Sequence, residues 1–229
     1  SIQGDKVVSG GEGGVSLTPN SMFSIDSSFM AIQQALQVGI HKDHPLQDFA
    51  VTGAGLKNRA HPLAIAVAHN QLKILPKILD RKSQCAAHFI ETLASIPFLK
   101  APVLESGAKS AWYALIFRFD GSQAPTGWTR ELYVQKFIAR GMKHIYIPNS
   151  TKPLYDEALY NVREDLGHVY APDMYAGEWK AADFPGAVTF HSQVIKLPVW
   201  AYEEDWATVK ACARAMLAVA RECIKTPLN

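Results

Sequence analysis

Three stretches of the chain repeat apolar residues at the spacing of an α-helix. The first covers residues 23–38, and Gly39 is suited to end it. The second covers residues 62–93 and begins at a proline, which the first turn of a helix accepts without losing a hydrogen bond. Pro76 lies inside this stretch and predicts a kink. The third covers residues 206–224, and its apolar face predicts a helix packed on a hydrophobic core.

Shorter apolar runs predict strands. Residues 13–18 have the pattern of a glycine turn followed by a short strand. Residues 111–119 are rich in aromatic and branched side chains and predict a stronger strand, and residues 144–147 predict a short one that stops at a proline. Between these two, Thr129 is suited to cap a helix that ends before Gly141. This strand–helix–strand order predicts a small α/β domain.

The composition is that of an ordinary globular protein. The chain has 229 residues, of which 48% are hydrophobic and 19% charged, so it is long enough to bury a core in one or two domains. The net charge is +2, and the basic residues are scattered without the interleaved aromatic residues of a nucleic-acid-binding surface. We therefore expect no nucleic-acid partner.

We expect a cytoplasmic protein. No apolar stretch approaches the length of a membrane span, and the polar, glycine-rich start has no signal-peptide pattern. The three cysteines, Cys85, Cys212 and Cys223, lack the spacing of a zinc site and are odd in number. They are typical of buried thiols in a reducing compartment.

The first fourteen residues place one lysine, Lys6, in a setting rich in small residues and turns. A lysine in a partly desolvated site loses its proton more easily and can act as a Schiff-base nucleophile. A solvated surface lysine is the commoner case for a lone lysine, because this residue type is mostly exposed. The residue types alone favour the second interpretation.

The spacing around Lys6 resembles the lysine motif of a known enzyme family. Ser-x-Gln-x-x-Lys, followed by Gly-Glu-Gly-Gly, is similar to the motif of the DegT/StrS-type sugar and cyclitol aminotransferases, pyridoxal-phosphate (PLP) enzymes of fold type I. The resemblance implies that Lys6 forms the internal aldimine, that Ser1 binds the cofactor phosphate and that Gln3 lines the same pocket. Relatives that act as dehydratases carry histidine in place of this lysine, so Lys6 favours amino transfer. Glu12 is interpreted as a structural tie between the glycine turns.

A second informative segment precedes the long helix. Lys57, Asn58 and Arg59 cluster before a helix start, where they either bind an anion or form a solvated loop tip. The segment resembles the family's Gly-Tyr-Asn-Tyr-Arg, which reaches across the dimer interface towards the partner's cofactor phosphate. The resemblance implies this role first for Arg59 and then for Asn58. His61, directly after it, is interpreted as a helix-start residue rather than a substrate-binding group.

Other histidines give weaker signals. His41 and His44, with Asp48, have a spacing that a metal site can use, but a solvated polar loop explains them better and we expect no metal. His168 lies in a polar, aromatic segment that is either a substrate contact or a surface excursion, and the second is favoured.

The resemblance covers only the C-terminal half of such an enzyme. It implies an α/β fold in which residues 1–61 end the cofactor-binding large domain, residues 62–97 form a long connecting helix and residues 98–229 form a small C-terminal α/β domain. Residues 183–199 resemble the family's ending, a short helix followed by a Leu-Pro turn. In the family, the upstream half carries the acid that pairs with the pyridine nitrogen, the residue that stacks on the ring and a phosphate-binding loop.

These observations lead to one functional expectation and one alternative. The resemblance implies a homodimeric PLP-dependent aminotransferase with shared active sites, which moves an amino group from an amino acid to a keto-sugar or keto-cyclitol. Glutamate or glutamine is the usual donor in the family, and Lys6 would also shuttle the proton. Activity is expected to need the upstream half. The alternative is a non-catalytic dimerisation or regulatory fragment of such an enzyme.

Overall fold

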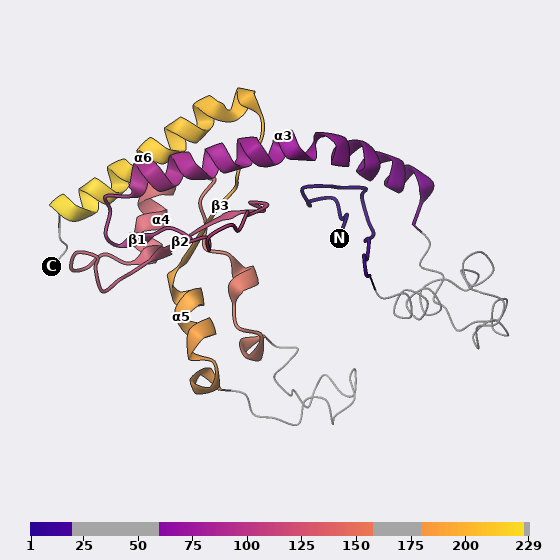
Figure 1. The fold of residues 1–229 in the computed structure, drawn as a ribbon. Coiled ribbons are helices and arrows are strands. Elements are labelled where there is room, and N and C mark those ends of the chain that lie inside the picture. Colours follow the sequence, from indigo (N-terminus) through magenta and orange to yellow (C-terminus); the bar gives the residue numbers. More distant parts are fainter. Residues whose placement is uncertain (20–59, 158–179, 227–229) are drawn as a thin grey trace, which may run out of the picture. The chain divides into compact units, whose positions relative to one another are not determined.

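A computed structural model of the chain describes residues 1–19, 60–157 and 180–226 (Figure 1). They belong to two compact units, Ser1–Pro76 and Lys77–Asn229. The helix expected at residues 23–38, the segment with His41 and His44, and His168 all lie outside the described residues. The domain boundaries expected from the sequence stay predictions.

The long helix α3 spans Pro62–Leu93, as the apolar periodicity of this stretch predicts. Pro76 lies inside the helix. His61 stands directly before it. Its Nδ1 accepts a hydrogen bond from the Leu63 N–H at 3.2 Å, and its carbonyl accepts one from the Ile65 N–H. The first bond satisfies a backbone donor that a helix start otherwise leaves without a partner, and the second is the first i→i−4 bond of the helix. The interpretation of His61 as a helix-start residue is therefore confirmed.

The second unit is built on a small antiparallel sheet. Its strands are β1 (Leu99–Lys100), β2 (Leu115–Phe119) and β3 (Val194–Leu197), in the order β1-β2-β3. Every second residue of β2 is buried, because alternate side chains of a strand point to opposite faces. The buried face carries Leu115, Phe117 and Phe119 into the core.

Two strand predictions need correction in this unit. The strand expected from residue 111 begins only at Leu115, because Trp112 adopts a left-handed backbone conformation with φ of 48° that a strand cannot include. The strand expected at residues 144–147 is reduced to a single bridge between Tyr146 and Lys196. In contrast, β3 forms where the sequence suggested only a turn, and it supplies the partner for both β2 and Tyr146.

The short strand expected at residues 15–18 also does not form. Val15 and Leu17 are exposed, and no strand pairs with this segment within the described residues.

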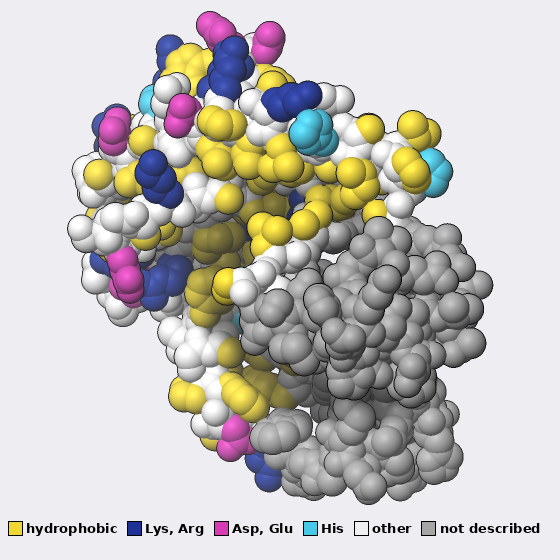
Figure 2. Space-filling model, turned by 45° about the vertical axis from the view of Figure 1, so that its right-hand side comes forward, with side chains coloured by type: hydrophobic (Ala, Val, Ile, Leu, Met, Phe, Trp, Pro, Cys, Tyr) yellow, Lys and Arg dark blue, Asp and Glu magenta, His cyan; other side chains and the backbone are white. Residues whose placement is uncertain are grey.

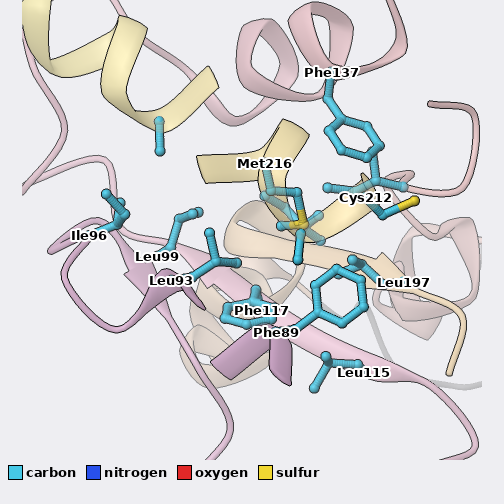
Figure 3. Packing of buried hydrophobic residues seen from close by; sticks show 14 of the residues in the cluster. Phe89, Leu93, Ile96, Leu99, Leu115, Phe117, Phe137, Leu197, Cys212 and Met216 are labelled. Atoms are coloured by element: carbon cyan, nitrogen blue, oxygen red, sulfur yellow. The ribbon is translucent and has the colours of Figure 1, made fainter. Parts of the chain in front are cut away.

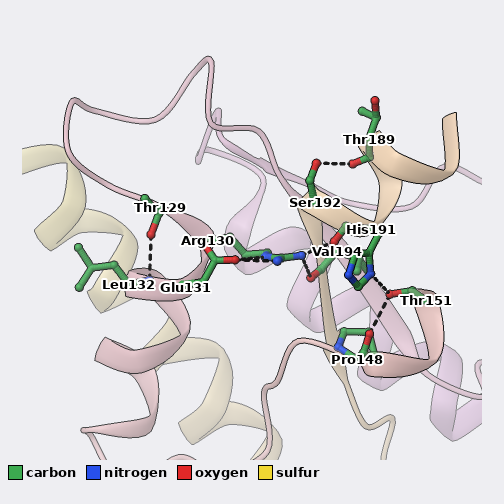
Figure 4. A network of polar contacts seen from close by, with 10 residues as sticks. All are labelled: Thr129, Arg130, Glu131, Leu132, Pro148, Thr151, Thr189, His191, Ser192 and Val194. Carbon is green, nitrogen blue, oxygen red and sulfur yellow. Dashed lines mark hydrogen bonds and ion pairs between the residues drawn. The ribbon is translucent and has the colours of Figure 1, made fainter. Parts of the chain in front are cut away.

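Three further helices surround the sheet: α4 (Arg130–Ile138), α5 (Pro185–Gln193) and α6 (Trp206–Lys225). Thr129 caps α4 as predicted, since its side-chain oxygen accepts a hydrogen bond from the Leu132 N–H at 3.2 Å (Figure 4). Gly141 follows α4 in a left-handed conformation with φ of 81°, as expected of a residue that ends a helix.

A chain of polar contacts fixes the end of α5 (Figure 4). The Arg130 guanidinium donates to the carbonyl oxygens of His191 and Val194. The Thr151 hydroxyl donates its one proton to the Pro148 carbonyl at 2.9 Å, so its oxygen accepts from His191 Nδ1 at 3.1 Å. His191 therefore ties segment 148–151 to α5.

The core of the second unit lies between α3, α4, α6 and the sheet (Figure 3). Phe89 from α3, Phe117 from β2 and Met216 from α6 are all fully buried. Tyr133 of α4 is buried as well, and its hydroxyl donates to the Met216 carbonyl at 2.9 Å, which joins α4 to α6.

The three cysteines are buried and free, as expected. Burial raises the pKa of each thiol, that of Cys223 to about 11. Within the described residues, no helix has the length and apolar character to cross a membrane, and no cluster of three metal-ligating side chains occurs.

Lys82 of α3 holds two loops of this unit in place. Its ammonium donates to the Trp112 carbonyl at 3.0 Å and to the Val199 carbonyl at 2.9 Å. Burial lowers the pKa of this amine. The bonds hold the left-handed turn at Trp112 and the chain after β3 against α3.

We expect Lys82→Met to lower the free energy of unfolding by about 1–3 kcal/mol, because it leaves two part-buried carbonyls without their donor. The measurement is urea unfolding of both proteins. Lys109→Met, at an exposed position, is the matched control and should change stability by less than about 0.5 kcal/mol. Equal stability of the Lys82 variant and the original protein would contradict this role.

Candidate functional site

The first fourteen residues form a closed loop around the buried side chain of Ile2. The Ile2 N–H donates to the Gly13 carbonyl at 2.9 Å, and the Gly10 N–H donates to the Ile2 carbonyl at 2.7 Å. A bridge between Gln3 and Gly11 adds a parallel contact. The loop therefore has a defined backbone although it contains no regular element.

Glycines are required at particular points of this loop. A Cβ atom on Gly10 would lie 2.5 Å from the Ala64 carbonyl oxygen of α3, far inside van der Waals contact. Gly11 and Gly13 have φ values of 98° and 128°, which side chains rarely allow. The glycine pairs of the motif therefore allow the loop backbone to lie close to α3 and to adopt left-handed turns.

The first half of α3 supports the loop. The Ser9 N–H donates to Gln71 Oε1 at 2.6 Å. The following residue, Gly10, lies close to the Ala64 carbonyl. Gln71 lies 62 residues from its partner, so the sequence around it carries no local signal of this role.

Lys6 lies in a turn of this loop. Its N–H donates to the Gln3 carbonyl at 3.0 Å, and its ammonium lies 3.5 Å from an Asp5 carboxylate oxygen. The side chains of Lys6 and Asp5 are 34% and 60% exposed, so neither is fully buried. Asp5 was not singled out from the sequence, although it is adjacent to the lysine.

Two more predicted site residues share this loop. The Ser1 hydroxyl oxygen accepts a hydrogen bond from the Gln3 N–H at 3.3 Å, and both side chains are exposed. Gln3 therefore connects Ser1 to Lys6 through its backbone N–H and carbonyl. Asn58 and Arg59, the other predicted cofactor contacts, lie outside the described residues.

The side chain of Glu12 is exposed, and within the described residues no hydrogen bond or ion pair joins it to the glycine turns. Backbone bonds to Ile2 hold those turns, and the structural role of Glu12 stays a prediction.

The side chains of this loop fit a ligand that combines a reactive carbonyl with a phosphate. Lys6 supplies a primary amine on a partly exposed side chain, the group that adds to a carbonyl carbon. The exposed Ser1 hydroxyl and Gln3 amide supply hydrogen-bond donors of the kind that bind phosphate oxygens. PLP has both groups.

We expect Gly10→Ala to open this loop, because the added methyl group clashes with backbone that cannot move aside. A cost of about 1–3 kcal/mol is typical of such overpacking. Hydrogen exchange of the peptide covering residues 1–14 should accelerate roughly tenfold or more.

Gly4→Ala is the matched control, since its Cβ would meet only the Gly11 carbonyl oxygen at 3.7 Å. Hydrogen exchange of the peptide covering residues 1–14 should be unchanged in this variant. Equal protection of the loop in the Gly10 variant and the original protein would show that the approach to Ala64 does not hold the loop.

Comparisons with known proteins agree with the resemblance seen in the sequence. The model of the DegT/DnrJ/EryC1/StrS aminotransferase family matches residues 1–212. The spore coat polysaccharide biosynthesis protein SpsC of Bacillus subtilis (strain 168) is 23% identical over 160 residues, which cover 69% of this chain and 36% of SpsC.

Solved structures show the same fold. The aminotransferase TlmJ from Streptoalloteichus hindustanus superposes with a TM-score of 0.60 at 20% identity, over 94% of this chain and 50% of TlmJ. The E. coli GDP-4-keto-6-deoxy-D-mannose-3-dehydratase with bound hydrated PLP gives a TM-score of 0.59 at 14% identity, over 85% of this chain and 47% of that enzyme. The chain thus spans about half or less of the length of these relatives.

Three expectations are confirmed by these matches. The fold is that of the C-terminal part of a fold type I aminotransferase. The expected enzyme class, and PLP as cofactor, are confirmed as properties of the family.

Proposed function

This chain belongs to the DegT/DnrJ/EryC1/StrS aminotransferase family, and on that premise we propose that it is the lysine-bearing part of a PLP-dependent sugar aminotransferase. The observation that carries the proposal is the loop at residues 1–14. It carries Lys6, Ser1 and Gln3, which are joined through the backbone N–H and carbonyl of Gln3, and it is held by hydrogen bonds to Ile2 and Gln71.

Each residue of the loop has a role in this proposal. Lys6 Nζ would hold the cofactor through a covalent bond and, when free, would move a proton at the substrate carbon. The Ser1 hydroxyl would donate to the cofactor phosphate, and the Gln3 side chain would line the same pocket. The Asp5 carboxylate orients the Lys6 ammonium before the cofactor binds. When bound, PLP supplies the electron sink for a carbanion.

Lys6 favours amino transfer over dehydration. The fold does not separate the two reactions, because a dehydratase has a similar structure. Dehydratase relatives carry histidine where this chain has Lys6, and only a primary amine can serve both as covalent anchor and as proton carrier. The acceptor in this proposal is a keto-sugar or keto-cyclitol, and the donor is glutamate or glutamine. The name of SpsC, a polysaccharide biosynthesis protein, supports a sugar acceptor.

The first half of α3 supports an association with further protein. Five apolar side chains at positions 63, 65, 67, 72 and 74 are between 41% and 71% exposed. Figure 2 shows that hydrophobic side chains are exposed at the surface of the described residues. At 3.6 residues per turn, Leu63, Val67 and Ile74 lie on one side of α3 and Ile65 and Leu72 on the opposite side, so both sides offer apolar surface of the kind that marks interaction sites.

In this proposal, the upstream half of the enzyme and a second subunit cover these side chains. Arg59 and Asn58 then reach the partner's cofactor phosphate in a homodimer. The buried free thiols are consistent with a reducing compartment such as the cytoplasm.

The test uses the complete enzyme, meaning this chain joined to the upstream half, loaded with PLP. Adding glutamate or glutamine should convert the cofactor to its amino form, which absorbance reports, and a keto-sugar should reverse the change. A complete enzyme that binds no PLP would favour the alternative, a non-catalytic protein. Bound PLP that none of the common amino acids converts would exclude amino transfer.

A further inference from the structure

A groove of about 500 Å³ lies between α3 and the chain that leads into α6. This volume is within the range of small-molecule sites, roughly 300–1,000 Å³. One wall is a polar face of α3, and the other is the segment that begins at Trp200. The α3 wall carries Lys77, Asp80, Arg81 and Gln84, and the opposite wall carries Trp200, Tyr202, Glu203 and Trp206. None of them is a predicted cofactor residue.

The charges of the groove cancel. Lys77 and Arg81 are opposed by Asp80 and Glu203. Arg81 Nη2 lies 3.2 Å from Glu203 Oε2, so this pair connects the two walls. A groove without net charge gives no electrostatic preference for an anion such as a phosphate.

The two tryptophans are held in place without a ligand. Trp200 stacks on Phe89, with 6.3 Å between ring centroids and 17° between planes, and meets His144 edge-on at 5.4 Å. Trp206 contacts His88 at 5.3 Å. Aromatic walls that are already ordered lose little conformational entropy when a ligand binds.

The same walls have unused hydrogen-bonding capacity. Trp128 shows the usual arrangement, since its indole N–H donates to the Thr226 carbonyl at 2.9 Å. Within the described part of the chain, the half-buried indoles of Trp200 and Trp206 donate no such bond, and the side chains of Asp80 and Gln84 have no hydrogen-bond partner. Donors and acceptors are therefore both available, next to aromatic surface.

We propose that this groove binds a neutral saccharide, at a site separate from the loop that carries Lys6. Each hydroxyl of a sugar both donates and accepts, which suits a wall with indole N–H, amide and carboxylate groups. The C–H groups of a sugar ring are apolar and can lie against an aromatic side chain such as Tyr202, and a neutral ring leaves the Arg81–Glu203 pair intact. The proposal does not depend on the aminotransferase function.

The test is saturation-transfer NMR on the complete enzyme with three probes, each added alone: glucose, rhamnose and N-acetylglucosamine. We expect transfer to at least one of them. Asp80→Ala should weaken its binding by about tenfold, the effect of losing a hydrogen bond to a charged group. Trp206→Ala should do the same, and the Asp80 variant keeps the test decisive if removal of Trp206 disturbs folding.

Two controls separate this groove from other sites. Glu105→Ala, at an exposed position, and Lys6→Ala should leave the transfer unchanged. The proposal is overturned if no probe shows transfer, or if transfer persists at full strength in both groove variants. Loss of transfer in Lys6→Ala would place the sugar at the lysine loop and would also overturn it.

Discussion

Lys6→Ala is expected to abolish amino transfer by the complete enzyme while the protein stays folded. The variant removes the amine that binds the cofactor and carries the proton, and loss of a proton-transfer group alone costs about 10²–10⁴ in rate. The structural cost is small. The Lys6 side chain is partly exposed and pairs with an exposed Asp5, and such pairs contribute at most about 1 kcal/mol.

Lys6→Arg tests whether the positive charge alone can replace the Lys6 amine. Arginine keeps the positive charge beside Asp5, but its guanidinium stays protonated and cannot bond to a carbonyl carbon. We therefore expect no turnover from this variant either. Steady-state amino transfer and the urea midpoint are measured for both variants, and full activity in either of them would refute the role of Lys6.

Phe89→Ala is expected to have the largest effect on stability. Phe89 is fully buried in the core of the second unit and stacks on Trp200. Truncation of a buried phenylalanine typically costs about 3–5 kcal/mol, because the transfer free energy is lost and a cavity remains. That is a large part of the free energy of unfolding of a domain, about 5–15 kcal/mol.

Urea unfolding measures this loss. Val103→Ala removes apolar surface at an exposed position of a loop and should change the free energy of unfolding by less than about 0.5 kcal/mol. If Phe89→Ala lowers the free energy of unfolding no more than Val103→Ala does, Phe89 is not packed in the core as described.

Features that depend on local sequence were predictable. The bounds of α3 follow from helical periodicity and a proline, and α4 follows from the cap at Thr129 and the glycine at 141. The lysine loop is also local, because Ser1, Gln3 and Lys6 are joined by bonds over two or three residues. A motif with fixed spacing captures such a site.

Features that depend on contacts between distant residues were not predictable. Strand β3 forms because β2 and Tyr146 pair with it from elsewhere in the chain. Likewise, Lys82 binds carbonyls 30 and 117 residues away, and Gln71 binds a loop 62 residues away. The residues next to Lys82 and Gln71 in the sequence do not indicate these partners. Apolar periodicity shows only which face of a helix or strand is buried.

The most direct test of the account is borohydride reduction of the PLP-loaded complete enzyme, followed by peptide mapping. Reduction makes the bond between cofactor and lysine permanent, so the modified residue can be identified by mass. We expect a phosphopyridoxyl group on the peptide that contains Lys6. A modified lysine elsewhere, or no modification after PLP is added, would contradict it.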